Sequence, residues 1–199
     1  MDVLVSDTTT PAAADVARSL LAAGHRVHVC QDDPHDDHCT ELTEGACPLD
    51  TAPIDVAVAV GDTVGRHLAD GALCAARRRI PLVLADAPAD HPLRPWATAQ
   101  SKSADAVATV EAVLARPLRD HTERARQALL QELRRQGSDA LAADVTVWRR
   151  PGRLQVELDY QQPITRTQAE RLVTHVAQAV RQYDRWAPKL DATVRPRST

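Results

Sequence analysis

Short apolar runs alternate with amphipathic segments along the first part of the chain. The apolar runs have the length and the Val, Leu and Ala content of strands buried in a parallel sheet. They lie near residues 2–6, 26–30, 54–60 and 80–85. Helical spacing of apolar residues occurs near 11–23, 64–79 and 103–114, and the polar or proline-rich segments 31–53 and 86–100 are predicted loops. This alternation predicts an α/β fold, with a Rossmann-like open parallel sheet and helices on both faces.

The pattern changes at Arg116-Pro117, and we place a domain boundary there, between residues 1–115 and 118–199. Residues 118–136 have the apolar spacing of an amphipathic helix. Its predicted buried stripe consists of Leu118, Ala125, Leu129, Leu130 and Leu133.

A β-hairpin is predicted next. Val145 and Val147 alternate with polar neighbours, as do the apolar residues of 154–160, so each strand has one buried and one wet face. Between them, Arg150-Pro151-Gly152-Arg153 fits a type II turn. The strand 154–160 is also a candidate sheet edge, able to pair with a second copy.

A second helix and a third strand complete the predicted domain. Thr167-Gln168-Ala169-Glu170 has the sequence of a capping box, opening a helix that runs to about Tyr183. Residues 190–194 are the predicted third strand. The second domain is therefore expected to be a small α-β-β-α-β two-layer unit, and a possible association module.

The turn after the first strand, Asp7-Thr8-Thr9-Thr10-Pro11-Ala12, contains no glycine. Thr8, Thr9 and Thr10 offer hydroxyls and amides at the start of a helix, where a small anion such as phosphate can bind. An ordinary N-cap by Thr10, followed by Pro11 at the first helical position, explains the same residues. The N-cap is the simpler interpretation.

Three segments resemble the opening of the epimerase-type NAD(P)-binding Rossmann family. They are Met1–Ser6, Leu20–Val27 and Ile54–Ala59, and the resemblance covers about residues 1–85. It implies a dinucleotide site in which a residue near Gln31, Asp32 or Asp33 contacts the ribose. The glycines that let the backbone approach a pyrophosphate are missing, and no Tyr-x-x-x-Lys pair is present. We therefore predict no tight NAD(P) binding, and the cofactor stays unknown.

A receiver-like layout is a weaker interpretation of the same strands. Asp7 follows the first strand and Asp62 follows the third, where a phospho-accepting Asp would stand. Lys102 does not follow a predicted strand, and no second acid adjoins Asp7. Carboxylates at strand ends are also common as helix caps.

The second domain resembles the alkaline-shock envelope-stress family over about residues 120–195. The pattern is carried by Asp144–Trp148, Leu154–Tyr160, the helix from Thr165 and Asp191–Val194. The resemblance implies a role in assembly, without enzymatic activity.

Cysteine and histidine gather in one acidic loop of the first domain. Cys30, His35, His38, Cys39 and Cys47 lie within 18 residues. Zinc accepts such ligands, but without a C-x₂-C pair the spacing matches no common zinc or iron–sulfur site. A metal site and a solvated acidic loop therefore both remain open. Cys74, further along the chain, is expected to pack in the core.

Composition favours a globular protein, because 44% of the residues are hydrophobic. No apolar run reaches the roughly 20 residues of a membrane span, and the start lacks a basic signal region, so we expect a cytoplasmic protein with reduced thiols. The excess of Arg over Lys and the many Ala residues are typical of a bacterial coding bias. Residues 1–62 hold 12 acids and 2 Arg, whereas 63–199 hold 15 acids and 22 bases. Such asymmetry can mark an oligomer that pairs opposite faces, although charges that merely solubilise two surfaces explain it as well.

Trp148 lies beside Arg149, Arg150 and Arg153, and both residue types are frequent in interface hot spots. In the alternative arrangement Trp148 lies under the helix 118–136 and completes the core. We expect a protein partner or self-association, and not nucleic acid, because the chain is acidic overall and carries no nucleic-acid-binding motif.

The predicted function is therefore that of a non-catalytic binding or assembly protein. One alternative is a nucleotide- or anion-binding enzyme or sensor that uses Thr8–Thr10. The other is a metal-binding protein that uses the Cys30–Cys47 loop.

Overall fold

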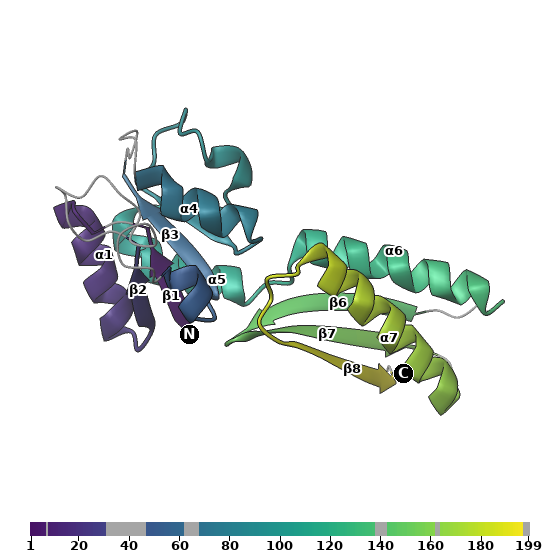
Figure 1. The fold of residues 1–199 in the computed structure, drawn as a ribbon. Helices are drawn as coiled ribbons and strands as arrows, with labels where there is room; N and C mark the ends of the chain where they lie inside the picture. Colours follow the sequence, from purple (N-terminus) through teal and green to yellow (C-terminus); the bar gives the residue numbers. More distant parts are fainter. Residues whose placement is uncertain (7, 31–46, 62–67, 138–142, 162–163, 197–199) are drawn as a thin grey trace. The chain divides into compact units, whose positions relative to one another are not determined.

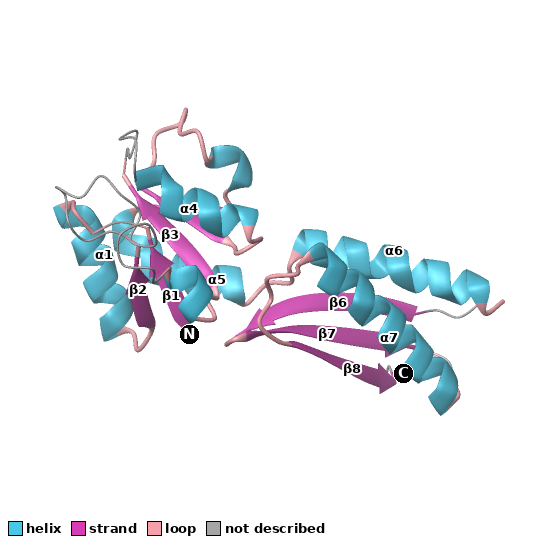
Figure 2. Ribbon diagram, in the orientation of Figure 1, coloured by secondary structure: helices cyan, strands magenta, loops and turns pink. Residues whose placement is uncertain are grey.

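The computed structural model describes residues 1–6, 8–30, 47–61, 68–137, 143–161 and 164–196. The chain forms two compact units, Met1–Ala115 and Arg116–Thr199. Each has its own sheet and helices (Figures 1 and 2).

The first unit contains a five-stranded sheet in which all strands are parallel. The strand order is β2-β1-β3-β4-β5. The strands are β1 (Asp2–Val5), β2 (Arg26–Val29), β3 (Val56–Val60), β4 (Leu82–Ala85) and β5 (Ala99–Ser101). The predicted Rossmann-like open sheet is therefore confirmed.

Helices cover both faces of this sheet, because alternate residues of each buried strand point to opposite sides. Val3, Val5 and Val58 pack in one core cluster with α1 (Pro11–Ala22) and α5 (Ala106–Leu114). Their sequence neighbours pack in a second cluster with α4 (Leu68–Arg77).

Short elements lie in both segments that were predicted to be loops. The helix α3 (Pro48–Thr51) lies in the first of them. The 3-10 turn η1 (Arg94–Trp96) and the strand β5 lie in the second, which is followed by η2 (Ser103–Asp105). The strand β5 has only three residues and no apolar run, so its pairing with β4 defines it and its own sequence does not.

The second unit has the predicted α-β-β-α-β order. Its elements are α6 (Arg119–Arg135), β6 (Ala143–Arg150), β7 (Arg153–Tyr160), α7 (Arg166–Tyr183) and β8 (Leu190–Pro196). The strands β6 and β7 are antiparallel, and β8 pairs with β7 in parallel. Both helices pack on one face of this sheet, over the apolar side chains of all three strands (Figure 1).

Three expectations for the second unit are wrong. The strand β7 is central and not an edge, because the β7-α7-β8 crossover places β8 beside it. The capping box of α7 is formed by Thr165 and Gln168, because the helix begins at Arg166, before the predicted Thr167. Leu130 of α6 is exposed, because it lies beyond the stripe that meets the sheet.

Candidate functional site

One face of the three-stranded sheet is covered by neither helix, and we call it the open face. Its central side chains belong to alternate residues of the three strands. They are Trp148, Arg150, Gln155, Glu157, Thr193 and Arg195. The predicted position of Trp148 on the wet side of the hairpin is confirmed, and Trp148 is absent from the core beneath α6.

The carboxylate of Glu157 organises the centre of the open face. Its Oε2 accepts a hydrogen bond from the indole Nε1 of Trp148 at 3.1 Å. Its Oε1 accepts from Gln155 Nε2 at 2.8 Å and lies 3.2 Å from Arg195 Nη2. The guanidinium of Arg150 lies 4.9 Å from the centre of the Trp148 ring. The indole is therefore held by Glu157 of β7 and Arg150 of β6, and Arg195 of β8 pairs in turn with Glu157.

The structure separates Arg149 from the other residues of the predicted interface. Trp148 and Arg150 stand on the open face. Arg153 lies at the start of β7, with its Nη1 3.4 Å from Asp191 Oδ2. Arg149 has the same parity as the core residue Val147 and is buried on the helix side.

Arg149 belongs to a buried ionic cluster with His121 and Asp184. The Oδ2 atom of Asp184 lies 3.0 Å from His121 Nε2 and 3.3 Å from Arg149 Nη2. Its Oδ1 accepts from the backbone N–H groups of Trp186 and Ala187, at 3.2 and 3.0 Å. The cluster joins α6, β6 and the end of α7. The sequence analysis missed it, although an arginine at an inward position of β6 was a signal for a buried partner.

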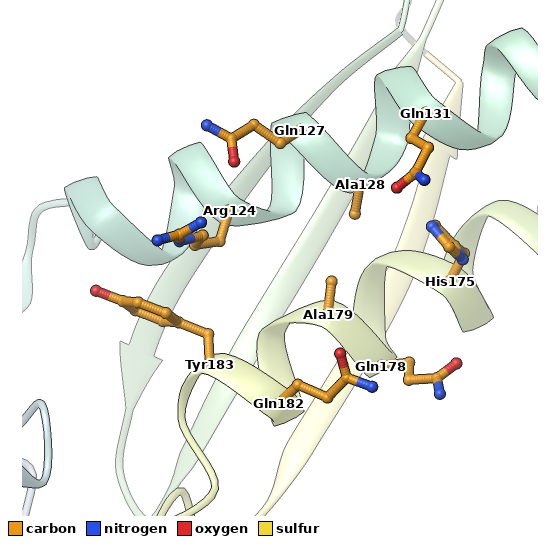
Figure 3. A pocket seen from close by; sticks show the side chains of 9 residues that line it. All are labelled: Arg124, Gln127, Ala128, Gln131, His175, Gln178, Ala179, Gln182 and Tyr183. Carbon is orange, nitrogen blue, oxygen red and sulfur yellow. The ribbon is translucent and has the colours of Figure 1, made fainter.

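A groove of about 470 Å³ runs between α6 and α7, on the side away from the sheet (Figure 3). Ala128 and Ala179 face each other across its floor, and Arg124 lies over the ring of Tyr183 at 5.4 Å. The rest of the lining consists of Gln127, Gln131, His175, Gln178 and Gln182. This set can donate and accept hydrogen bonds, and His175 also lines an adjoining hollow together with Glu132 and Glu170.

The predicted anion site lies at the carboxyl edge of the five-stranded sheet. In doubly wound sheets of the observed strand order, ligands bind at the carboxyl ends of β1 and β3, because the helices that follow these two strands lie on opposite faces of the sheet. The turn that holds Thr8–Thr10 follows β1 at this point. Thr10 acts as the N-cap of α1, since its Oγ1 accepts from Ala13 N at 3.2 Å. Thr8 and Thr9 are half-buried. The Ser6 hydroxyl is buried at the same edge and has no hydrogen-bond partner among the described residues.

A second polar group at this edge follows β4 and β5. Asp86 adopts a φ of 52° and accepts hydrogen bonds from the hydroxyl and the backbone N–H of Ser103. The Ser103 hydroxyl lowers the pKa of Asp86, burial opposes this, and the Ser103 amide and Lys102 lower it further. Lys102 directly follows β5, so the expectation that it stands apart from a strand end is wrong. Asp7 and Asp62 of the receiver-like interpretation lie outside the described residues.

The predicted metal ligands lie only partly in the described chain. Cys30 follows β2 and is half-buried, and Cys47 is buried before α3. A methyl group at Gly71 of α4 would lie 2.9 Å from Cys30 Sγ, so glycine permits this close packing. Cys74 is exposed, so the prediction that it packs in the core is wrong.

The remaining ligands of that prediction, His35, His38 and Cys39, fall outside the residues that the structure describes. Within the described ranges, no three His, Cys, Asp or Glu side chains are grouped so as to hold a metal ion.

Asp2 is buried at the amino edge of the same sheet and contacts three polar partners there. Its carboxylate accepts from Arg26 Nη2 at 2.5 Å and contacts His28 Nε2 at 2.8 Å, and its backbone N–H donates to Asp55 Oδ2 at 2.9 Å. Burial alone would raise the pKa of Asp2, but the hydrogen bonds from His28 and Arg26 outweigh it and lower the pKa.

In the part of the chain that the structure describes, no helix combines the length and apolarity needed to cross a bilayer. No protein-family model matches the sequence, and no curated protein is similar to it.

Proposed function

We propose that the protein is a non-catalytic assembly protein that self-associates through the open face of its C-terminal unit. The observation that carries this proposal is the arrangement of Trp148, which stands on an uncovered sheet face with its orientation fixed by Glu157 and Arg150.

This arrangement has the properties of an interface anchor. The indole contributes a large apolar area, and its N–H already has an acceptor, so burial against a partner leaves no unsatisfied donor. Ordering the side chain on association costs little entropy, because partners on neighbouring strands already hold it. Trp and Arg are also the residue types that most often dominate binding energy.

The charge of the open face suits a second copy of the same chain. Arg195 pairs with Glu157 and Arg153 with Asp191, and Arg150 lies over Trp148 on the same face, so both signs occur on one surface. A surface with both signs can meet its own copy with opposite charges opposed. The resemblance of residues 120–195 to the alkaline-shock family, which implies an assembly role, points the same way.

Replacing Trp148 by Ala tests the proposal, with association measured by light scattering and folding by thermal melting. Loss of a hot-spot contribution of about 2 kcal/mol should weaken association roughly thirtyfold. The control is Trp96→Ala, which removes an exposed indole from the first unit and should leave association unchanged. A large loss of melting temperature in Trp148→Ala, with an unaltered oligomer, would contradict the proposal.

A second candidate function is binding of a small anion at the carboxyl edge of the five-stranded sheet. The strand order favours it, because it places the turn Thr8–Thr10 at the carboxyl ends of the neighbouring strands β1 and β3. The Ser6 hydroxyl is buried at that edge, with no hydrogen-bond partner among the residues that the structure describes. A thermal-shift panel of phosphate, nucleotides, NAD(P) and divalent metals tests it. A rise in melting temperature with phosphate or nucleotides, reduced in Thr9→Val, is the expected result, and no shift with any anion would contradict it.

A further inference from the structure

The two edges of the C-terminal sheet differ in what covers them. On β6, the outward N–H of Val147 donates to Thr122 Oγ1 at 3.0 Å, and its C=O accepts from Leu118 N at 2.7 Å. The start of α6 therefore occupies the middle of this edge. On the other side β8 is the last strand, and no described strand pairs with its outer edge.

The register shows which backbone groups of β8 face outward. The N–H of Leu154 donates to the carbonyl of Lys189 at 2.8 Å. In a parallel ladder the groups that face the neighbour belong to alternate residues, here Lys189, Asp191 and those that follow at steps of two. The N–H and C=O groups of the intervening residues therefore point to the open edge. They belong to Leu190, Ala192 and Val194.

We propose that β8 pairs antiparallel with β8 of a second copy, with Thr193 opposite Thr193, so that the two sheets join into one of six strands. The proposal rests on the proposed function, in which the C-terminal unit associates with a second copy. It adds a second contact, at the edge of β8, which leaves Trp148 of β6 free for the open-face contact. In this register Ala192 exchanges two backbone hydrogen bonds with Val194 of the second copy, and the symmetry repeats the pair.

Several registers of the β8–β8 pair keep the open-face residues of both copies on the same side of the joined sheet. Side-chain charge favours the register with Thr193 opposite Thr193. On the open face, Asp191 lies opposite Arg195 of the second copy, and Arg195 opposite its Asp191. Opposite charges in such cross-strand positions are stabilising, and like charges are destabilising. A shift of two residues one way brings Lys189 opposite Arg195. The other shift places Thr193 opposite Arg195 and removes both Asp191–Arg195 pairs. It also moves Pro196, which has no N–H to donate, from a position opposite Leu190 at the end of the strand to one opposite the central Ala192.

The helix side of the joined sheet is also compatible. Leu190, Ala192 and Val194 pack toward the core and would continue the apolar layer across the junction. The helix α7 contacts β8, and its α6 side carries His175, Gln178 and Gln182. Its opposite side presents the half-buried Val173 and Ala177 beyond β8, where α7 of the second copy would approach.

A cysteine at position 193 tests the contact directly. The four native cysteines are first replaced by Ser in the full chain. Directly opposed residues of a non-hydrogen-bonded antiparallel pair have Cα atoms about 4.5 Å apart, within the range of a disulfide. Under a mild oxidant, Thr193→Cys should form a covalent dimer on a non-reducing gel. Thr146→Cys, on the open face of β6, is the matched control. Combined with Trp148→Ala, which weakens the open-face contact, it should stay monomeric on that gel.

Ala192→Pro provides the second arm, because it removes one outward N–H without touching the ladder to β7. In the Trp148→Ala background, which weakens the open-face contact, light scattering should show loss of the remaining dimer, with a retained circular dichroism spectrum. Arg195→Asp should weaken the dimer, and the added Asp191→Arg should restore it.

The inference is overturned if Thr193→Cys forms no covalent dimer, if Thr146→Cys forms it equally well, or if folded Ala192→Pro keeps the dimer. Should Ala192→Pro not fold, the cysteine result alone decides. If Trp148→Ala weakens association but Thr193→Cys forms no covalent dimer, the β8 pairing is wrong and the open-face contact of the proposed function stands. If Thr193→Cys forms the covalent dimer but Trp148→Ala has no effect on association, the β8 pairing stands and the open-face contact is wrong.

Discussion

The hydroxyl of Thr122 on α6 accepts a hydrogen bond from the backbone N–H of Val147, at the outer edge of β6, at 3.0 Å. Exposed strand edges promote unwanted pairing, and proteins often cover them with another element. Here the cover is the first turn of α6, which also donates Leu118 N–H to the Val147 carbonyl. On the other side of the sheet, no strand of the described chain pairs with the outer edge of β8.

The hydrogen bond of Thr122 should contribute to stability. Thr122→Val keeps the shape of the side chain but removes the acceptor, so the Val147 N–H loses its partner at a cost of about 1 kcal/mol. Urea unfolding, followed by tryptophan fluorescence with Trp96 replaced by Phe, measures this change in the second unit. The control Thr174→Val removes an exposed hydroxyl from α7. Equal stability of the two variants would contradict the prediction.

Adjacent arginines on β6 should differ strongly in their effect on folding. Arg149→Met removes the guanidinium partner of the buried Asp184 carboxylate and leaves it with His121 and two backbone N–H groups, and breaking such a buried pair costs about 3–5 kcal/mol. Arg150→Met removes a cation–π contact on the open face, which is worth about 1 kcal/mol or less. The free energy of unfolding of the second unit measures both. Similar losses of unfolding free energy in the two variants would contradict the prediction.

Asp2 should make the first unit sensitive to acid. Its pKa in the folded chain lies below that of the unfolded chain, about 3.9. The ionised carboxylate therefore stabilises the fold above that pH, and this contribution is lost as the pH falls through the lowered folded pKa. Asp2→Asn should be less stable at pH 7 and should lose part of the dependence below about pH 4.

The measurement for Asp2 is urea unfolding at several pH values, followed by Trp96 after replacement of Trp148 and Trp186 by Phe. The matched control is Asp15→Asn on α1, whose carboxylate is exposed. An unchanged pH dependence in Asp2→Asn would refute the assignment.

Calorimetry with NADH and NADPH should give no micromolar affinity. Thr8 to Pro11 occupy the turn where a dinucleotide-binding fold places glycines, and their side chains keep a pyrophosphate away from the backbone. Micromolar binding of either cofactor would contradict this expectation.

The elements that the sequence predicted well are those whose own residues decide their structure. The strands β1 and β3 are continuous apolar runs, and the alternation in β6 placed Trp148 on the open face. The strand β5 could not be found in this way, because Ala99–Ser101 becomes a strand only by pairing with β4. The central position of β7 likewise depends on the path of the chain after α7.

The candidate site shows the same division. Alternation along β6 is enough to point Arg149 inward, but its acceptor Asp184 lies 35 residues away and is reached only in the folded unit. The N-cap of α7 was ambiguous for a local reason. Both Thr165-x-x-Gln168 and Thr167-x-x-Glu170 have the capping-box pattern, and the earlier one forms because the helix extends to Arg166.

The most direct test of the central claim, that this chain assembles with itself, is its mass in solution. Size-exclusion chromatography with light scattering should be run on the full chain over a wide range of concentrations. The account predicts a mass above the 21.7 kDa of one chain, rising with concentration to at least that of a dimer. A mass of 21.7 kDa at every concentration would contradict it.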